Sequence, residues 1–152
     1  MRVLIADGDM PFLGMLQSFL RDGGHEIEVA ADGLGCRSVL RNFIPEVLVI
    51  ERDLLWGGSD GVLAVMRDDP DLGEVPVILI TNRRGDVRPD WCATPPIASS
   101  LQKPFRLSAL LREAAAAIQQ GQTNGFGRAH CQSEEADHQS DFATSRAVLS
   151  TR

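Results

Sequence analysis

The sequence lacks the features of a membrane protein or a disulfide-rich one. No apolar stretch approaches the ~20 residues that a membrane-spanning helix needs, and the chain begins with a strand-like run rather than a signal segment. Its three cysteines, Cys36, Cys92 and Cys131, are odd in number, widely separated and without a Cys-x-x-Cys pair. This spacing favours neither a disulfide framework nor a zinc site. We therefore expect a soluble protein of the reducing cytoplasm.

Positive charge is scarce as well. The 15 lysines and arginines are outnumbered by 21 aspartates and glutamates, which gives a formal net charge of −6. Surfaces that bind nucleic acids or anionic membranes normally carry a basic face. The charge balance therefore argues against both, and it favours proteins, cations or phosphorylated groups as partners.

Lysine is the scarcest basic residue, because only one of the 15 is a lysine, Lys103. It stands in Lys103-Pro104-Phe105, directly after a strand-like stretch at residues 97–101. A lysine ammonium can bind a phosphoryl or carboxylate oxygen as a point charge. Lys103 is thus either a functional residue or a lysine left by chance in an arginine-rich composition. The placement of the other polar residues decides between these two interpretations.

The rest of the chain has the composition of one globular domain, with 152 residues, 43% apolar and 24% charged. Continuous apolar runs suit strands buried on both faces, as in a parallel sheet covered by helices. We predict strands in the segments 2–6, 25–30, 47–50, 75–80 and 97–101.

Segments with helical spacing alternate with these strands. The clearest begins near Pro11 and ends at Gly23-Gly24, with proline at its start and glycine past its end. Further helices are predicted at 37–43 and 61–67, and a last one that Ser108 caps. The alternation predicts an α/β fold with a doubly wound, five-stranded parallel sheet.

Two segments depart from this alternation. Residues 83–96 should supply the fourth helix, but they include Pro89, Pro95 and Pro96, so we expect a short or irregular segment there. Residues 120–152 are rich in polar and small residues and predict a flexible, disordered tail after a domain at 1–119. No output domain is recognisable after it, which favours a stand-alone module.

Polar residues follow the apolar runs at the point where each predicted strand ends. Asp7, Glu51, Thr81 and Lys103 hold these positions. Because ligands of open parallel sheets bind beyond the carboxyl ends of the strands, we expect the four side chains to share one crevice. Two acids, a hydroxyl and an ammonium can hold a divalent cation and orient a phosphoryl group.

Five motifs, in this order and at suitable spacing, resemble those of a response-regulator receiver domain. The motifs are Val3-Leu-Ile-Ala-Asp7, Pro45-Glu-Val-Leu-Val-Ile-Glu51, Asp60-Gly61, Pro76-Val-Ile-Leu-Ile-Thr81 and Lys103-Pro104-Phe105. The resemblance implies a flavodoxin-like, CheY-like fold and a non-enzymatic role in two-component phosphorelay signalling. It also implies protein partners, either a histidine kinase or a downstream signalling protein.

The resemblance assigns roles by position. Asp7 would help to hold Mg²⁺, Thr81 would bond a phosphoryl oxygen, and Lys103 would pair with the acceptor and then with the phosphate. The Lys103–Pro104 peptide is expected to be cis, which proline permits. The family usually has two adjacent acids after the first strand, whereas this chain has Asp7-Gly8-Asp9. Asp9 is therefore either a second cation ligand or the N-cap of the following helix.

The acceptor position has two candidates. Counting from the strand gives Glu51, whose extra methylene moves the carboxylate on the order of 1.5 Å. Counting back from Asp60 gives Asp53, because the loop around Trp56 is longer than usual. We prefer Glu51, since choosing Asp53 would leave Glu51 inside a buried strand. The extended carboxylate of Glu51 could reach Lys103 and Thr81.

A further departure concerns Ser100, which stands where the family usually places an aromatic that turns inward on activation. Serine cannot bury the same area, so either the signalling surface around 83–100 is remodelled or the aromatic has been lost neutrally in a domain that no longer switches. The leading hypothesis is a pseudo-receiver that acts through protein contacts. The alternative is a conventional phosphoacceptor that uses Asp53 and Mg²⁺. A small hydrolase or flavin-binding protein of similar topology is disfavoured, because no glycine-rich phosphate loop follows the first strand and no nucleophile has a histidine base.

Overall fold

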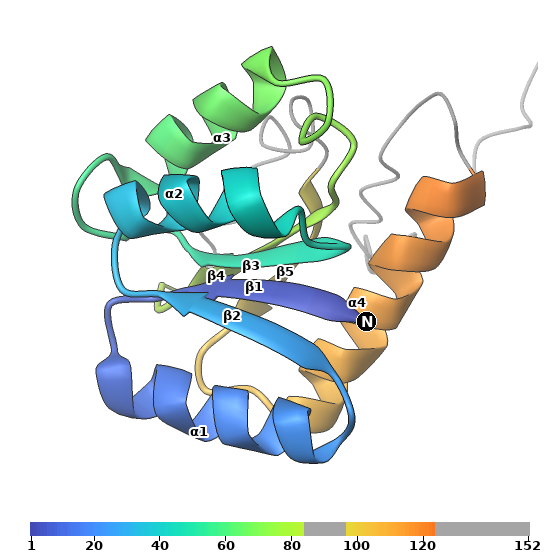
Figure 1. The fold of residues 1–152 in the computed structure, drawn as a ribbon. Helices are drawn as coiled ribbons and strands as arrows, with labels where there is room; N and C mark the ends of the chain where they lie inside the picture. Colours follow the sequence, from blue (N-terminus) through green and yellow to red (C-terminus); the bar gives the residue numbers. More distant parts are fainter. Residues whose placement is uncertain (84–96, 124–152) are drawn as a thin grey trace, which may run out of the picture.

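The computed structural model describes residues 1–83 and 97–123, and these form a parallel sheet between two layers of helices (Figure 1). The sheet has five strands in the order β2-β1-β3-β4-β5, and every neighbouring pair is parallel. This architecture confirms the doubly wound α/β fold that the sequence predicts. The strands are β1 (Arg2–Ala6), β2 (Glu26–Ala30), β3 (Val47–Glu51), β4 (Val77–Thr81) and β5 (Ile97–Gln102).

Helices cover both faces of the sheet (Figure 1). Side chains alternate between the two faces along each strand, so the protein has two hydrophobic cores. One core lies under α2 and α3, and the other lies under α1 and α4. The helices are α1 (Met10–Asp22), α2 (Gly33–Phe43), α3 (Gly58–Asp68) and α4 (Leu107–Thr123).

The sequence predicts where the helices lie better than where they begin. The second helix begins at Gly33 instead of residue 37, because Asp32 caps it by accepting the Gly35 N–H. The third begins at Gly58 instead of residue 61. Ser108 lies inside α4, so its prediction as a cap is wrong. Glycine-rich first turns lack apolar periodicity, and this hid the true starts of α2 and α3.

Other expectations fall on parts of the chain that the structure does not describe. The irregular segment expected at 83–96 lies, from residue 84 onward, outside the described residues, as do Trp91 and Cys92. The predicted tail also lies outside them from residue 124 onward, while α4 continues to Thr123. Within the described residues, no helix is long and apolar enough to cross a membrane.

The sheet register positions the candidate site. Ala6 pairs with Ile50 across β1 and β3, and Thr81 pairs with Gln102 across β4 and β5. The residue that follows each pairing point therefore emerges at the same carboxyl edge of the sheet. The peptide between Lys103 and Pro104 is cis, as the resemblance implied.

Candidate functional site

Lys103 lies at the centre of the group of side chains expected in a crevice at the carboxyl edge of the sheet. Its Nζ donates to the Asp7 Oδ2 at 2.5 Å and lies 3.5 Å from the Glu51 Oε1. The ammonium also lies over the Phe12 ring, 4.4 Å from the centroid. Two carboxylates and one aromatic face therefore surround the only lysine of the chain.

The Asp7 carboxylate is fully buried, at 0% exposure. Its Oδ2 accepts from Lys103, and its Oδ1 accepts the Asp9 N–H at 2.9 Å. A carboxylate removed from water needs such charged and hydrogen-bonding partners. Lys103 therefore pairs more closely with Asp7 than with Glu51, the acceptor position from which its main contact was expected.

Glu51, the last residue of β3, has both carboxylate oxygens engaged. Oε2 accepts the Gly8 N–H at 3.2 Å, and Oε1 accepts the Asn82 Nδ2–H at 3.0 Å. Together with the Lys103 ammonium, these donors bind the carboxylate from the segments that follow β1, β4 and β5. Asn82 was missed in the sequence, although its position directly after Thr81 pointed toward this edge.

Thr81 is buried at the end of β4, at 2% exposure. Its hydroxyl accepts the Arg83 N–H at 3.0 Å, which fixes the turn after the strand. The structure gives Glu51 no hydrogen bond to this hydroxyl, so the expected reach from Glu51 to Thr81 is wrong. The bond from Thr81 to a phosphoryl oxygen, which the resemblance implies, stays a prediction.

Asp9 is the N-cap of α1. Its Oδ1 accepts the Phe12 N–H at 3.0 Å, as a capping side chain does. Of the two readings of Asp9, the structure therefore supports the cap. Gly8 holds the place between the two acids, and a Cβ built on it would lie 3.8 Å from the Glu51 Oε2. A side chain at position 8 would therefore be directed at the Glu51 carboxylate.

These residues do not fit a divalent cation. Oxygen-rich sites for Mg²⁺ are built from carboxylates that are free to bind the metal. Here Asp7 is occupied by Lys103, Asp9 caps a helix, and position 8 has no side chain. Among the described residues, no group of three or more His, Cys, Asp or Glu could hold a metal ion.

Asp53, the other candidate acceptor, lies two residues beyond the end of β3. Its side chain is 50% exposed and pairs with the Arg83 Nε at 3.5 Å. The loop that follows turns through Trp56, Gly57 and Gly58, all with positive φ. This longer loop explains the two-residue disagreement between the counts, and it leaves Glu51 rather than Asp53 against Lys103.

Ser100 lies within β5, where it pairs with Leu79 and is partly buried. The aromatic residues nearest to Lys103 are instead Phe12 and Phe105, whose rings meet edge to face with centroids 5.8 Å apart. This pair was missed in the sequence, although Phe105 follows Lys103-Pro104 directly. Most of the predicted partner surface at 83–100 lies outside the described residues.

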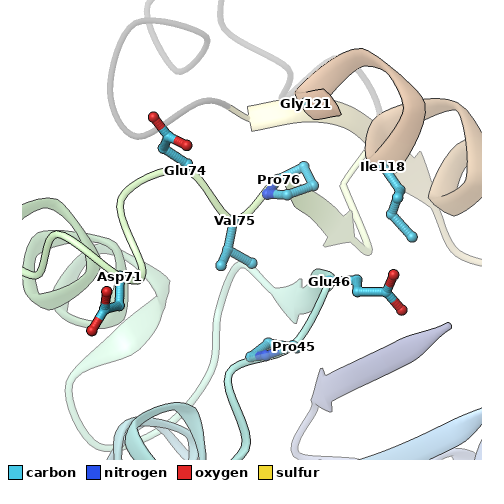
Figure 2. A pocket seen from close by; sticks show the side chains of 8 residues that line it. All are labelled: Pro45, Glu46, Asp71, Glu74, Val75, Pro76, Ile118 and Gly121. Carbon is cyan, nitrogen blue, oxygen red and sulfur yellow. The ribbon is translucent and has the colours of Figure 1, made fainter. Parts of the chain in front are cut away.

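A hollow lies at the opposite, amino edge of the sheet, with a volume of about 230 Å³ (Figure 2). It holds carboxylates, but within the described residues no lysine or histidine lines it. Of these carboxylates, that of Glu46 accepts a backbone hydrogen bond, from the Arg2 N–H to its Oε2 at 2.6 Å. The lining residues are Pro45, Glu46, Asp71, Glu74, Val75, Pro76, Ile118 and Gly121.

Comparison with known proteins supports the resemblance. No protein-family model matches the chain. It is 29% identical over 89 residues to the response regulator PleD of Caulobacter vibrioides, an alignment that covers 56% of this chain and 19% of PleD. The chain thus matches about a fifth of that relative's length.

Solved structures of receiver domains share the fold. A CheY-like receiver domain of Methanospirillum hungatei aligns with a TM-score of 0.72 at 18% identity, covering 82% of this chain and 98% of that one. The chemotaxis response regulator CheY4 of Vibrio cholerae aligns at 0.68 and 20%, covering 76% and 96%. The receiver domain of sensor histidine kinase PA1611 of Pseudomonas aeruginosa, which has magnesium in its active-site cleft, aligns at 0.66 and 18%, covering 78% and 98%. The resemblance to receiver domains is therefore confirmed at the level of the fold.

Proposed function

We propose that this chain is a pseudo-receiver of two-component signalling, which acts through protein contacts without being phosphorylated. The observation that carries the proposal is the state of Glu51, the residue at the acceptor position. Its carboxylate is bound by the Gly8 N–H, the Asn82 amide and the Lys103 ammonium. Lys103, which the resemblance assigns to the phosphoryl group, is thus already paired with the carboxylates of Asp7 and Glu51.

The chemistry of phosphoryl transfer supports this proposal. In-line positioning and charge neutralisation provide most of the catalysis, so a displaced nucleophile and residues that do not fit a cation both weigh against transfer. Glutamate displaces the carboxylate by one methylene. The charges of Asp7, Glu51 and Lys103 sum to −1, which disfavours a phosphoryl dianion.

The role of the crevice is then to fix the shape of the carboxyl edge. Lys103 forms the cis peptide after β5, Gly8 leads into α1 and Asn82 follows β4, so the contacts of Lys103 and Glu51 join three loops. A partner protein would bind to this fixed arrangement of loops. We propose a non-enzymatic role in the cytoplasm, with a histidine kinase or a downstream signalling protein as the partner.

The test is intact-protein mass after incubation with acetyl phosphate and Mg²⁺. The parent, Glu51→Gln and Asp53→Asn chains are compared, each with its fold verified by circular dichroism. A pseudo-receiver gives no phosphoryl adduct in any of the three. The double variant Gly8→Asp/Glu51→Asp, which supplies a second acid and shortens the acceptor, serves as the matched attempt to restore acceptance.

The same experiment tests the alternative function. An adduct on the parent that persists in Glu51→Gln and disappears in Asp53→Asn would make the chain a conventional phosphoacceptor that uses Asp53. An adduct lost in Glu51→Gln would overturn the proposal in a different way, because Glu51 itself would then accept the phosphoryl group.

A further inference from the structure

Helix α1 has an exposed face without charge. No Asp, Glu, Lys or Arg occurs between Met10 and Leu20, and the charged residues Arg21 and Asp22 stand in the last turn. Three large apolar side chains are exposed along it, Met10 at 59%, Met15 at 50% and Phe19 at 44%. An outer helix face normally carries charged residues opposite its apolar stripe.

The other helices follow that rule, which makes α1 the exception. Exposed charged residues lie on the outer faces of α2, α3 and α4. They include Arg41 on α2, Asp60 and Arg67 on α3, and Arg112 on α4. Figure 1 shows α1 as an outer layer on its side of the sheet, with its long axis along the surface. The uncharged face therefore points outward.

Gly14, in the middle of α1, adds a second observation. A Cβ at this position would meet nothing within 4 Å, and the residue has no left-handed backbone that would require glycine. Gly33 is different, because its Cβ would lie 2.3 Å from the Trp56 carbonyl oxygen. Glycine inside a helix is less stable than alanine, so the fold of one chain supplies no reason for Gly14.

We propose that this face of α1 binds α1 of a second copy of the chain, in a twofold-symmetric contact. A twofold contact pairs a surface with itself, so a surface that carries net charge repels its own copy. The chain carries a net charge of −6, and on the α1 face two copies can meet without setting acids against acids. Gly14 would let the two helix backbones approach closely.

The size of the face limits how strong this association can be. The uncharged segment of about ten residues is roughly 15 Å long, at 1.5 Å per residue. Stable interfaces bury about 800 Å² on each partner, and one helix face provides less. We therefore expect a weak, reversible dimer that forms as the protein concentration rises.

The experiment follows self-association of the full chain by sedimentation equilibrium over a range of concentrations, with methyl NMR of the methionines. The chain contains four methionines, of which Met10 and Met15 lie on the face and Met66 is buried at 0% exposure. The signals of Met10 and Met15 should shift with concentration, and that of Met66 should not. Met15→Glu should abolish the association, because it places like charges across the twofold axis.

Gly14→Ala gives the sharper test, because its two expected effects have opposite signs. The dilute monomer should melt roughly 4 °C higher, since alanine favours the helix. The association constant should fall at least about tenfold, since two added methyl groups separate the helices. Gly61→Ala is the matched control, since Gly61 lies in α3 with equally open space around its Cβ. It should raise the melting temperature without changing the association.

Each contrary result would overturn the proposal. A chain that stays monomeric, with constant Met10 and Met15 signals, has no self-contact on α1. A dimer that survives both Met15→Glu and Gly14→Ala uses another surface.

Discussion

Both edges of the sheet carry acidic side chains, but the acids differ in burial and in their partners. At the carboxyl edge, Asp7 is fully buried and paired with Lys103, and the Glu51 side chain is 13% exposed. At the amino edge, Asp71 and Glu74 are exposed around an open hollow (Figure 2). The acids at the carboxyl edge are bound by residues from distant parts of the chain, whereas those at the amino edge are exposed to solvent.

This difference shows which acids are tied to a specific structure. A buried charge is tolerated only with a partner in good geometry, so the Asp7–Lys103 pair holds together residues 96 positions apart. Exposed acids are screened by solvent and salt, and they constrain little. Changes at the carboxyl edge should therefore have large effects, and changes at the amino edge small ones.

Removing the ammonium should have the largest effect. Lys103→Met leaves the buried Asp7 carboxylate without its charged partner, which should lower the free energy of unfolding by about 3–5 kcal/mol. Urea unfolding measures the change. The double variant Asp7→Asn/Lys103→Met should recover most of the loss, because no unpaired charge then remains. If the two changes are simply additive, the pair does not carry the stability assigned to it.

The missing side chain at position 8 can be restored. Gly8→Asp directs a third carboxylate toward Glu51, which should raise the affinity of this edge for Mg²⁺ above that of the parent. Thermal unfolding with and without Mg²⁺ measures it. The variant should gain up to about 2.7 kcal/mol at a hundredfold excess over Kd, and the parent should respond less. A parent that Mg²⁺ stabilises equally well would contradict the fit described for this crevice.

Cys36 shows the effect of burial without an ion pair, because its thiol is buried without a charged partner of opposite sign. Burial, and secondarily the nearby Asp32, raises the pKa of its thiol from 9.0 to about 12. Above pH 9 the unfolded chain loses this proton while the folded chain keeps it. Stability should therefore be intact below pH 9 and fall as the pH rises toward 12, by up to about 1.4 kcal/mol per pH unit.

Denaturant unfolding at a series of alkaline pH values measures this slope. The chain is well suited to the test, because it contains no tyrosine and only one lysine, so few other groups titrate in this range. Cys36→Ala should flatten the curve, whatever its effect on stability at neutral pH. An unchanged slope in this variant would assign the alkaline loss to other groups.

The smallest effect is expected at the amino edge. Glu74→Gln removes one exposed charge beside the hollow and should change the free energy of unfolding by less than about 0.5 kcal/mol. Urea unfolding at low and high salt measures it. A loss comparable to that of Lys103→Met would remove the contrast between the two edges.

Local sequence patterns predicted much of this protein. The apolar runs fixed the strands, because strands buried on both faces exclude polar residues. The polar residue that ends each run marked the crevice, and the parallel sheet brought Asp7, Glu51, Thr81 and Lys103 to one edge as expected. Pro11 marked the start of α1 and Gly23 its end, each to within a residue or two.

The tertiary structure alone decided how these residues pair. The sequence left Asp9 as a ligand or a cap, it left open whether Glu51 or Asp53 lies against Lys103, and it did not identify Asn82 or Phe12 as neighbours of Lys103 or Glu51. Each choice depends on side-chain direction across segments that are dozens of residues apart. Spacing along the chain records which residues reach the edge of the sheet, whereas contacts within about 3–4 Å depend on how neighbouring loops turn. The fold could therefore be predicted from local patterns, while the partner of Lys103 was set only by packing.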